Sequence, residues 1–115
     1  MTKIRIHENS RIPKLLSWFI NIKAITIYPF IFVNGKVDSQ RLQNHELIHI
    51  AQQRELFLIG FYLLYGYYWV KNLLWHRMPV QTAYREIPFE REAYHGQNFD
   101  NYLDTRQRMA WRKWI

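Results

Sequence analysis

The sequence predicts a single α+β domain that is mostly helical, with a small sheet of two or three strands packed on one long helix. A chain of 115 residues is large enough for one modest core and too short for two. Hydrophobic residues make up 49% of the chain and aromatic residues 17%, which is typical of a folded protein. Strand signals lie before residue 34 and helix signals dominate after it. We therefore assign one domain to residues 1–115, with a basic C-terminal tail from about residue 100.

The N-terminal third carries the strand signals. Residues 3–7 alternate polar and β-branched side chains, the period of a half-buried strand. Pro13 suits the first turn of a short helix that continues to about residue 22. Residues 24–33 are rich in β-branched and aromatic side chains and predict one strand, with Pro29 at a sheet edge or bulge. Such an edge could accept an extended peptide as a further strand.

The long helix is expected at residues 39–57, capped by Asp38 or Ser39. It contains the sequence HELIH at residues 45–49, which fits the pattern H-E-x-x-H. Residues four apart on a helix lie one above the other, so His45 and His49 can direct their imidazoles at one metal ion. Glu46 is then well placed to take a proton from a water whose pKa zinc lowers to roughly 7. The sequence therefore predicts Zn²⁺ as the cofactor, two histidine ligands, and Glu46 as the general base.

A catalytic zinc site takes three protein ligands and leaves the fourth position open. The downstream sequence offers Glu86, Glu90 and Glu92. A helix over residues 88–98, started by its proline, places Glu90 and Tyr94 on one face and turns Glu92 about 200° away, toward solvent. Glu90 is the predicted third ligand, and Glu86 is the second choice.

Residues 56–70 contain no charged side chain. A membrane-spanning helix needs about 20 predominantly apolar residues, so we predict instead a buried helix that packs behind the metal-binding helix. The membrane alternative stays open, because the run reaches that length at residue 75 with one lysine. Pro79 should end this segment. Arg54 and Glu55, just before it, are expected on a solvated face.

The chain has 16 Lys and Arg against 9 Asp and Glu, a formal net charge of +7. This excess favours anionic partners, but no recognisable reading motif accompanies it, so nucleic acid is not an expected partner. The tail beyond residue 100 is basic, contains Trp111 and Trp114, and is expected to form a short amphipathic helix or an extended arm.

Without cysteine, any metal must be held by His, Asp or Glu. No signal peptide is visible, so we expect a cytoplasmic or membrane-associated protein.

The HELIH motif, followed about forty residues later by Glu90-x-x-Ala93, resembles the gluzincins, in which two histidines and a later glutamate bind zinc. The small size and the order of elements are most similar to the minigluzincins and to the catalytic cores of HtpX-type and prenyl-protein endopeptidase-type membrane peptidases. The resemblance covers about residues 24–98. It implies a zincin-like domain and a zinc metalloendopeptidase with His45, His49 and Glu90 as ligands and Glu46 as general base.

The sequence departs from that pattern in one respect. Those membrane peptidases usually have an aspartate four residues after the ligand glutamate, where this chain has Tyr94. The aspartate orients a ligand histidine, a task that a tyrosine hydroxyl could perform in part. Minigluzincins often use a histidine as third ligand, which makes His95 a reserve candidate. Tyr84, Tyr94 and His95 are the candidate donors to an oxyanion.

The expected partner is a peptide or protein substrate, with contact to a membrane surface and self-association through the C-terminal tail as further possibilities. That tail could also block the cleft, as the C-terminal segments of latent minigluzincins do. Two other functions compete with peptide hydrolysis. One is a catalytically idle zinc-binding domain that keeps the site for folding or for a partner. The other is a small membrane-associated protein with a structural role.

Overall fold

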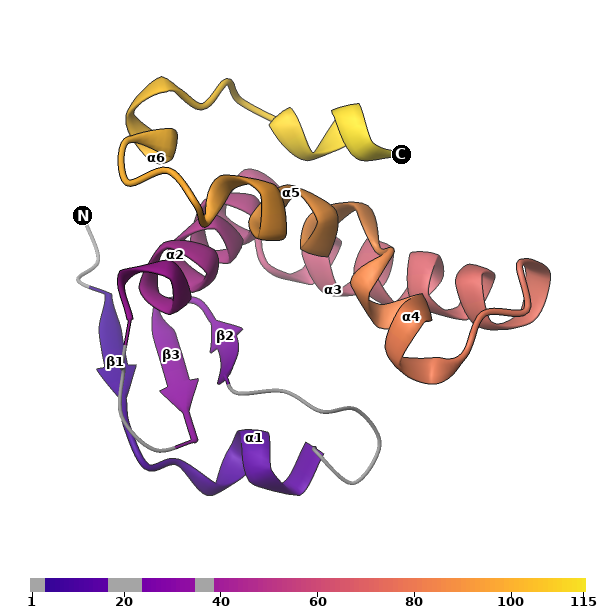
Figure 1. Ribbon diagram of the computed structural model, residues 1–115, viewed down its shortest axis with the longest axis horizontal. Coiled ribbons are helices and arrows are strands. Elements are labelled where there is room, and N and C mark those ends of the chain that lie inside the picture. Colours follow the sequence, from indigo (N-terminus) through magenta and orange to yellow (C-terminus); the bar gives the residue numbers. More distant parts are fainter. Residues whose placement is uncertain (1–3, 17–23, 35–38) are drawn as a thin grey trace.

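The computed structural model describes residues 4–16, 24–34 and 39–115, and these form the α+β fold that the sequence predicts. Its central element is α2 (Gln40–Glu55). The sheet packs on one side of α2 and α5 (Pro88–Gly96) on another, and the C-terminal segment lies over α5 (Figure 1). The predicted arrangement of a small sheet on the HELIH helix is therefore confirmed.

The sheet has three strands in the order β1-β3-β2: β1 (Arg5–His7), β2 (Ala24–Ile27) and β3 (Phe30–Val33). The central strand β3 runs parallel to β1 and antiparallel to β2. The prediction of one strand over residues 24–33 is wrong, because Tyr28 and Pro29 form a turn between two strands. A proline lacks the N–H that a central strand needs and has a φ suited to turns.

The other N-terminal predictions are met in part. All three residues of β1 are exposed rather than half-buried. The short helix α1 (Arg11–Leu16) includes Pro13 in its first turn. Its predicted continuation to residue 22 lies outside the described residues, as do Lys3, Gly35 and Asp38.

The N-terminus of α2 is capped as predicted, since the backbone N–H of Leu42 donates to Ser39 Oγ at 3.1 Å. The helix is held to the sheet by a cluster in which Ile50 packs with Ala24, Ile31 and Val33. Burial of these apolar side chains fixes the rotation of α2 about its axis.

After α2 the chain forms α3 (Ile59–Val70), the π-helical turn η1 (Lys71–Trp75), α4 (Val80–Arg85) and α5. Both prolines act as predicted, because Pro79 precedes α4 and Pro88 is the first residue of α5. Ring centroids of Phe61 and Phe89 lie 4.7 Å apart, and those of Phe89 and Trp111 also 4.7 Å. This second cluster joins α3, α5 and the C-terminal segment.

The expectation that residues 56–70 form a buried helix is wrong for most of α3. Phe61 is its one buried residue, whereas Leu63 is 70% exposed. The helix packs against α2 and α4, while Ile59, Leu63, Tyr67 and Val70 are each more than half exposed. Across the described ranges, no helix combines the length and the apolarity that crossing a bilayer requires.

The C-terminal segment forms α6 (Tyr102–Thr105) and the 3₁₀ helix η2 (Ala110–Trp114). It corrects two predictions. Glu92 is fully buried rather than turned to solvent, and its carboxylate accepts hydrogen bonds from the Tyr102 hydroxyl at 2.7 Å and from Arg106 Nε at 2.6 Å. Glu55 is not solvated either, because Arg106 binds both its oxygens at 3.0 and 2.9 Å. Helix phase predicted that the face of α5 carrying Glu90 is buried. The C-terminal segment also buries the face that carries Glu92.

Candidate metal centre

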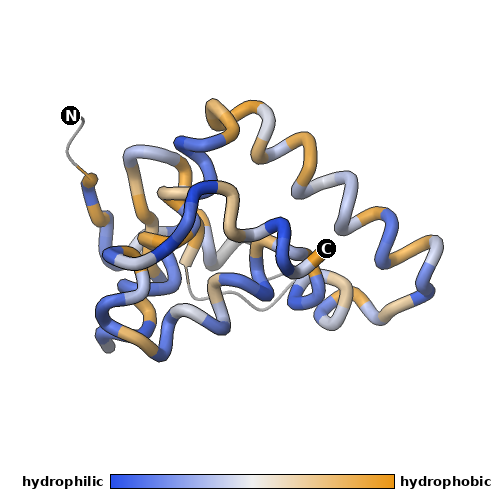
Figure 2. Tube along the Cα trace, turned by 90° about the horizontal axis from the view of Figure 1, so that it is seen from above, coloured by the Kyte–Doolittle hydropathy of each residue, from blue (hydrophilic) through white to orange (hydrophobic). Residues whose placement is uncertain are grey.

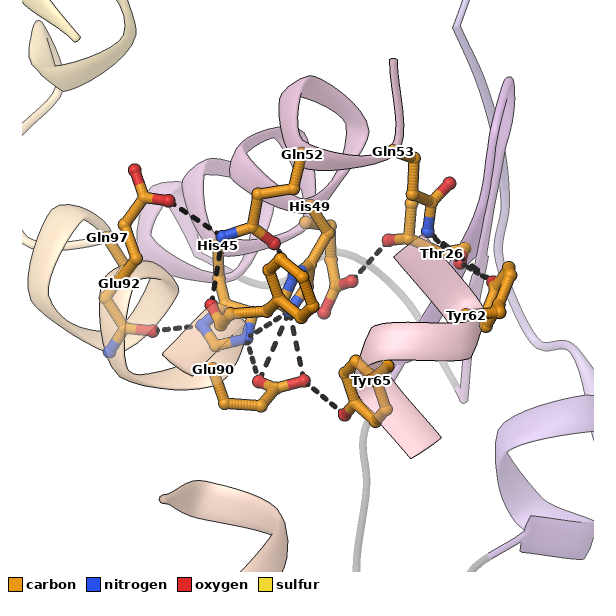
Figure 3. Close-up of polar contacts among 12 residues, drawn as sticks. Thr26, His45, His49, Gln52, Gln53, Tyr62, Tyr65, Glu90, Glu92 and Gln97 are labelled. Carbon is orange, nitrogen blue, oxygen red and sulfur yellow. Dashed lines mark hydrogen bonds and ion pairs between the residues drawn. The ribbon is translucent and has the colours of Figure 1, made fainter. Parts of the chain in front are cut away.

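The two HELIH histidines and Glu90 meet in the interior between α2 and α5. His45 Nε2 lies 3.1 Å from Glu90 Oε1, His49 Nε2 lies 3.2 Å from the same oxygen, and the two nitrogens are 3.2 Å apart (Figure 3). Ligands at 2.0–2.1 Å from a tetrahedral ion are separated by about 3.3 Å. The three atoms therefore form a triangle with the dimensions of one face of such a tetrahedron, and this group could hold a metal ion.

Both imidazoles are oriented through their other nitrogen. His49 Nδ1 lies 2.8 Å from Gln52 Oε1, and His45 Nδ1 lies 2.8 Å from Gln97 Oε1 (Figure 3). The Gln52 amide has a defined orientation, because its nitrogen donates to the Phe89 carbonyl at 3.0 Å and to Glu92 at 2.9 Å. Its oxygen must then accept from His49. With each Nδ1 donating a proton, each Nε2 presents a lone pair, as metal ligation requires.

Two bare imidazole nitrogens and a carboxylate oxygen at this separation repel one another unless a cation lies between them. In the metal-free protein, a proton can be that cation. Burial alone would lower the pKa of His49, but the charge and hydrogen bond of Glu90 raise it from 6.5 to about 9. Burial would raise the pKa of Glu90, but the charge of His49 and hydrogen bonds from both histidines hold it below its usual value. A metal ion would replace this proton.

Glu46 is buried on α2 and turned toward the sheet. It is 5% exposed, and one of its carboxylate oxygens accepts a hydrogen bond from the Thr26 hydroxyl on β2. The strand thus holds the side chain of the predicted base in one orientation.

Two tyrosines contact the ligands. The Tyr65 hydroxyl of α3 donates to Glu90 Oε2 at 2.6 Å. The Tyr94 ring stands edge-on to His45 at 4.6 Å between centroids, and the Arg85 guanidinium lies over the same ring. Burial, with the nearby Glu90 charge, raises the pKa of both tyrosines. Both hydroxyls therefore keep their protons near neutral pH and are hydrogen-bond donors.

The alternative ligands lie elsewhere. Glu86 precedes α5, is about half exposed and pairs with Arg91 at 3.7 Å. His95 is exposed and contacts the rings of Phe99, Tyr102 and Trp114. Tyr84 is buried beside Tyr94. The structure thus brings Glu90 to the two histidines, as the helix-phase argument predicted, and does not bring Glu86 or His95.

The sheet edge next to the site is partly occupied. Gln53 of α2 donates to the Thr26 carbonyl at 2.7 Å and accepts from the Tyr28 N–H at 2.6 Å. The Tyr62 hydroxyl donates to the same carbonyl at 2.6 Å. These are the backbone groups through which an added strand would pair. A peptide could pair at residues 26–28 only by displacing these side chains, and its addition at this edge stays a prediction.

Sequence reasoning missed the residues that orient the ligands. Gln52 follows His49 by three positions on α2, and Gln97, the C-cap residue of α5, follows Glu90 by seven, so helical spacing could have indicated both. Tyr65 and Thr26 carry no such signal, because their elements meet the site through tertiary packing. The tail packs on α5, with Trp111 on Phe89 and Arg106 on Glu92, and its Trp114 lines a pocket that also includes Tyr94. Blockage of the cleft by the tail stays a prediction.

No family model matches the chain, and neither the curated proteins nor the solved structures include a match.

Proposed function

We propose that this chain is a zinc-dependent hydrolase of peptide bonds, with His45, His49 and Glu90 as ligands and Glu46 as general base. The observation that carries the proposal is the triangle of two Nε2 atoms and one carboxylate oxygen, each about 3.2 Å from the next. Two nitrogens and one oxygen are the donor set of the catalytic His₂Glu zinc sites. The resemblance to the gluzincins, in which two histidines and a later glutamate bind zinc, supports the same assignment.

Within the proposal each residue has a defined task. A bound Zn²⁺ supplies Lewis acidity, which polarises the scissile carbonyl and makes water a nucleophile near neutral pH. Glu46, held by Thr26, accepts the proton and delivers it to the leaving amine. Gln52 and Gln97 keep both imidazoles in the ligating tautomer. Tyr94, whose ring lies against His45, keeps its hydroxyl proton and is the candidate donor to an oxyanion, whereas the Tyr65 proton is already donated to Glu90 and positions that ligand.

The ligand assignment is tested by metal content. Mass spectrometry of the purified protein should find one zinc per chain in the wild type. His45→Ala and Glu90→Gln should lose it, because either change leaves two ligands. Glu86→Gln makes the same chemical change at the exposed alternative and should keep full zinc content. If Glu86→Gln loses zinc and Glu90→Gln keeps it, the assignment fails.

Hydrolysis is tested separately with Glu46→Gln. This variant should keep zinc, because Glu46 is not a ligand, and should lose cleavage of a peptide library by about 10²–10⁴-fold, the usual contribution of a general base. A variant that cleaves like the wild type would rule out Glu46 as the base.

A second candidate, an idle zinc-binding domain, is favoured by the burial of the site. The histidine side chains are 7% exposed and that of Glu90 is 4% exposed, and the neighbouring strand edge is filled by Gln53. A metal there would connect α2 and α5 and stabilise the fold. This function predicts zinc without turnover on any peptide, together with a melting temperature that falls when a chelator is added. A chelator-insensitive fold would count against it.

A further inference from the structure

One side of α3 is apolar and open to solvent. Ile59 is 72% exposed, Leu63 70%, Tyr67 57% and Val70 51%. Their spacing of four, four and three residues places them within about 80° of the helix circumference, at 100° per residue. In a helix of a water-soluble protein, such an apolar stripe normally faces the hydrophobic core. Here its side chains are open to solvent. Hydrophobic stretches recur along the outer helical segments of the molecule (Figure 2).

The stripe continues through η1. In this π-helical turn the His76 N–H donates to the Lys71 carbonyl, five residues back. The wider turn brings Leu74 and Trp75, 75% and 79% exposed, to the same side as Val70. These side chains line a shallow groove of about 880 Å³ together with Tyr62, Leu63, Gly66, Tyr67 and Lys71. We call Ile59, Leu63, Tyr67, Val70, Leu74 and Trp75 the α3–η1 face.

The face is large for a monomeric protein. Its six side chains are each more than half exposed, whereas monomeric soluble proteins rarely expose large contiguous apolar patches. Phe57, 85% exposed, lies two residues before the start of α3. Phe57 and Leu58 both have positive φ, 56° and 63°, a conformation that bulky residues rarely adopt. The α2–α3 turn thus holds an aromatic ring outward at a conformational cost.

The charged residues that accompany the face along the chain are basic. Between Glu55 and Glu86 the sequence contains no Asp or Glu. Lys71 lines the groove and is exposed, and Arg77, also exposed, follows η1 directly. The chain as a whole carries +7. An apolar stripe flanked by basic residues, with tyrosine and tryptophan along it, matches the interfacial region of an anionic bilayer.

We propose that the α3–η1 face lies in the surface of an anionic membrane, with the helix parallel to the bilayer plane. The position of Lys71 favours a lipid surface over a second copy of the chain as the partner of this face. In a helix-to-helix dimer this ammonium would be buried in a seam that lacks acidic residues, which is costly. At a bilayer its aliphatic stem lies along the apolar face while the charged end reaches the phosphates. The proposal concerns a surface and does not depend on metal binding.

The test is flotation with vesicles, with substitutions that leave the charge unchanged. The wild type should float with mixed phosphatidylcholine–phosphatidylglycerol vesicles and bind at least tenfold less to pure phosphatidylcholine. The Leu63→Gln/Leu74→Gln protein should bind the mixed vesicles at least tenfold less than the wild type. The matched control is Phe99→Gln/Leu103→Gln, which replaces two apolar side chains, 51% and 38% exposed, outside the face. It should float like the wild type.

A second pair of substitutions tests the charge. Lys71→Gln/Arg77→Gln should lower the preference for phosphatidylglycerol, and added salt should weaken wild-type binding. Circular dichroism and melting temperature confirm that each variant is folded. The proposal is overturned if the wild type stays in the aqueous fraction, or if the Phe99/Leu103 control loses as much binding as the face variant. It is also overturned if sedimentation finds a dimer that Leu63→Gln/Leu74→Gln converts to monomer, because the face would then bind a second copy.

Discussion

The metal-free protein should lose stability as the pH rises from about 6.5 to about 9, because folded His49 holds a proton that unfolded His49 releases. The pKa of His49 is about 9 in the folded protein, whereas an ordinary histidine has 6.5. A group whose pKa is raised by folding contributes its full stabilisation below the unfolded pKa. That contribution disappears as the pH rises through the folded pKa.

The size of the effect follows from the same two values. They differ by about 2.5 pH units, and each unit corresponds to 1.36 kcal/mol, so the proton contributes about 3 kcal/mol at low pH. Against the 5–15 kcal/mol of a typical domain this is a large share. Glu90 stays ionised throughout, since its own pKa is held below the usual value, so the loss is attributed to His49.

The assay is urea unfolding in the presence of a chelator, at several pH values from about 6 to 9, for the wild type and His49→Gln. The difference between the two proteins removes the contributions of other titrating groups. It should shrink by about 3 kcal/mol over this range. Zinc affinity should change in the opposite direction and rise with pH, because the metal must displace the same proton. A wild-type stability that is flat or rising relative to His49→Gln would show that the buried cluster does not hold this proton.

Three further outcomes follow from particular contacts. Gln97→Leu removes the acceptor for His45 Nδ1 and should weaken zinc binding about 10–100-fold in a chelator competition, whereas exposed Gln107→Leu should not. Arg106→Met leaves the Glu55 and Glu92 carboxylates without their cation and should cost about 3–5 kcal/mol in urea unfolding, whereas exposed Arg108→Met should stay within about 0.5 kcal/mol. In thermal melts, Gly66→Ala, whose Cβ meets open space, should stabilise by about 0.5–1 kcal/mol. Gly96→Ala should destabilise by about 1–3 kcal/mol, because its Cβ would lie 2.6 Å from Tyr102 and 2.7 Å from Ile48. In each case the second variant lacks the contact that the first one changes. If both variants of a pair had equal effects, that contact would not explain the result.

Much of the fold could be predicted because its determinants are local. The Ser39 cap, the uninterrupted helix after it and the breaks at Pro79 and Pro88 depend on residues within one turn of each other. His45 and His49 share a helix face for the same reason. The error at residues 24–33 arose because a two-residue turn and a bulge in an edge strand have similar composition. Pro29 is compatible with both.

The burial of individual charged groups could not be predicted in this way. Glu92 and Glu55 look like surface carboxylates in the sequence, and what buries them is the C-terminal segment, which returns from residue 106 to cover α5. The exposure of α3 was missed for the converse reason. Hydrophobicity predicts that a helix has an apolar face but does not say whether another element is left to cover it.

The sequence by itself therefore determined the α+β class, the capped helix and the pairing of His45 with His49, since each depends on spacing along the chain. Helix phase favoured Glu90 over Glu86 and Glu92, and the tertiary structure brought it to within 3.2 Å of both histidines. Tertiary structure alone decided that Gln97 reaches His45 and that Thr26 holds Glu46. It also decided which apolar faces became core and which remained open. These outcomes depend on how α2, α3, α5 and the sheet pack against one another, and separate elements can be brought to within about 3 Å only by the packing of the whole chain.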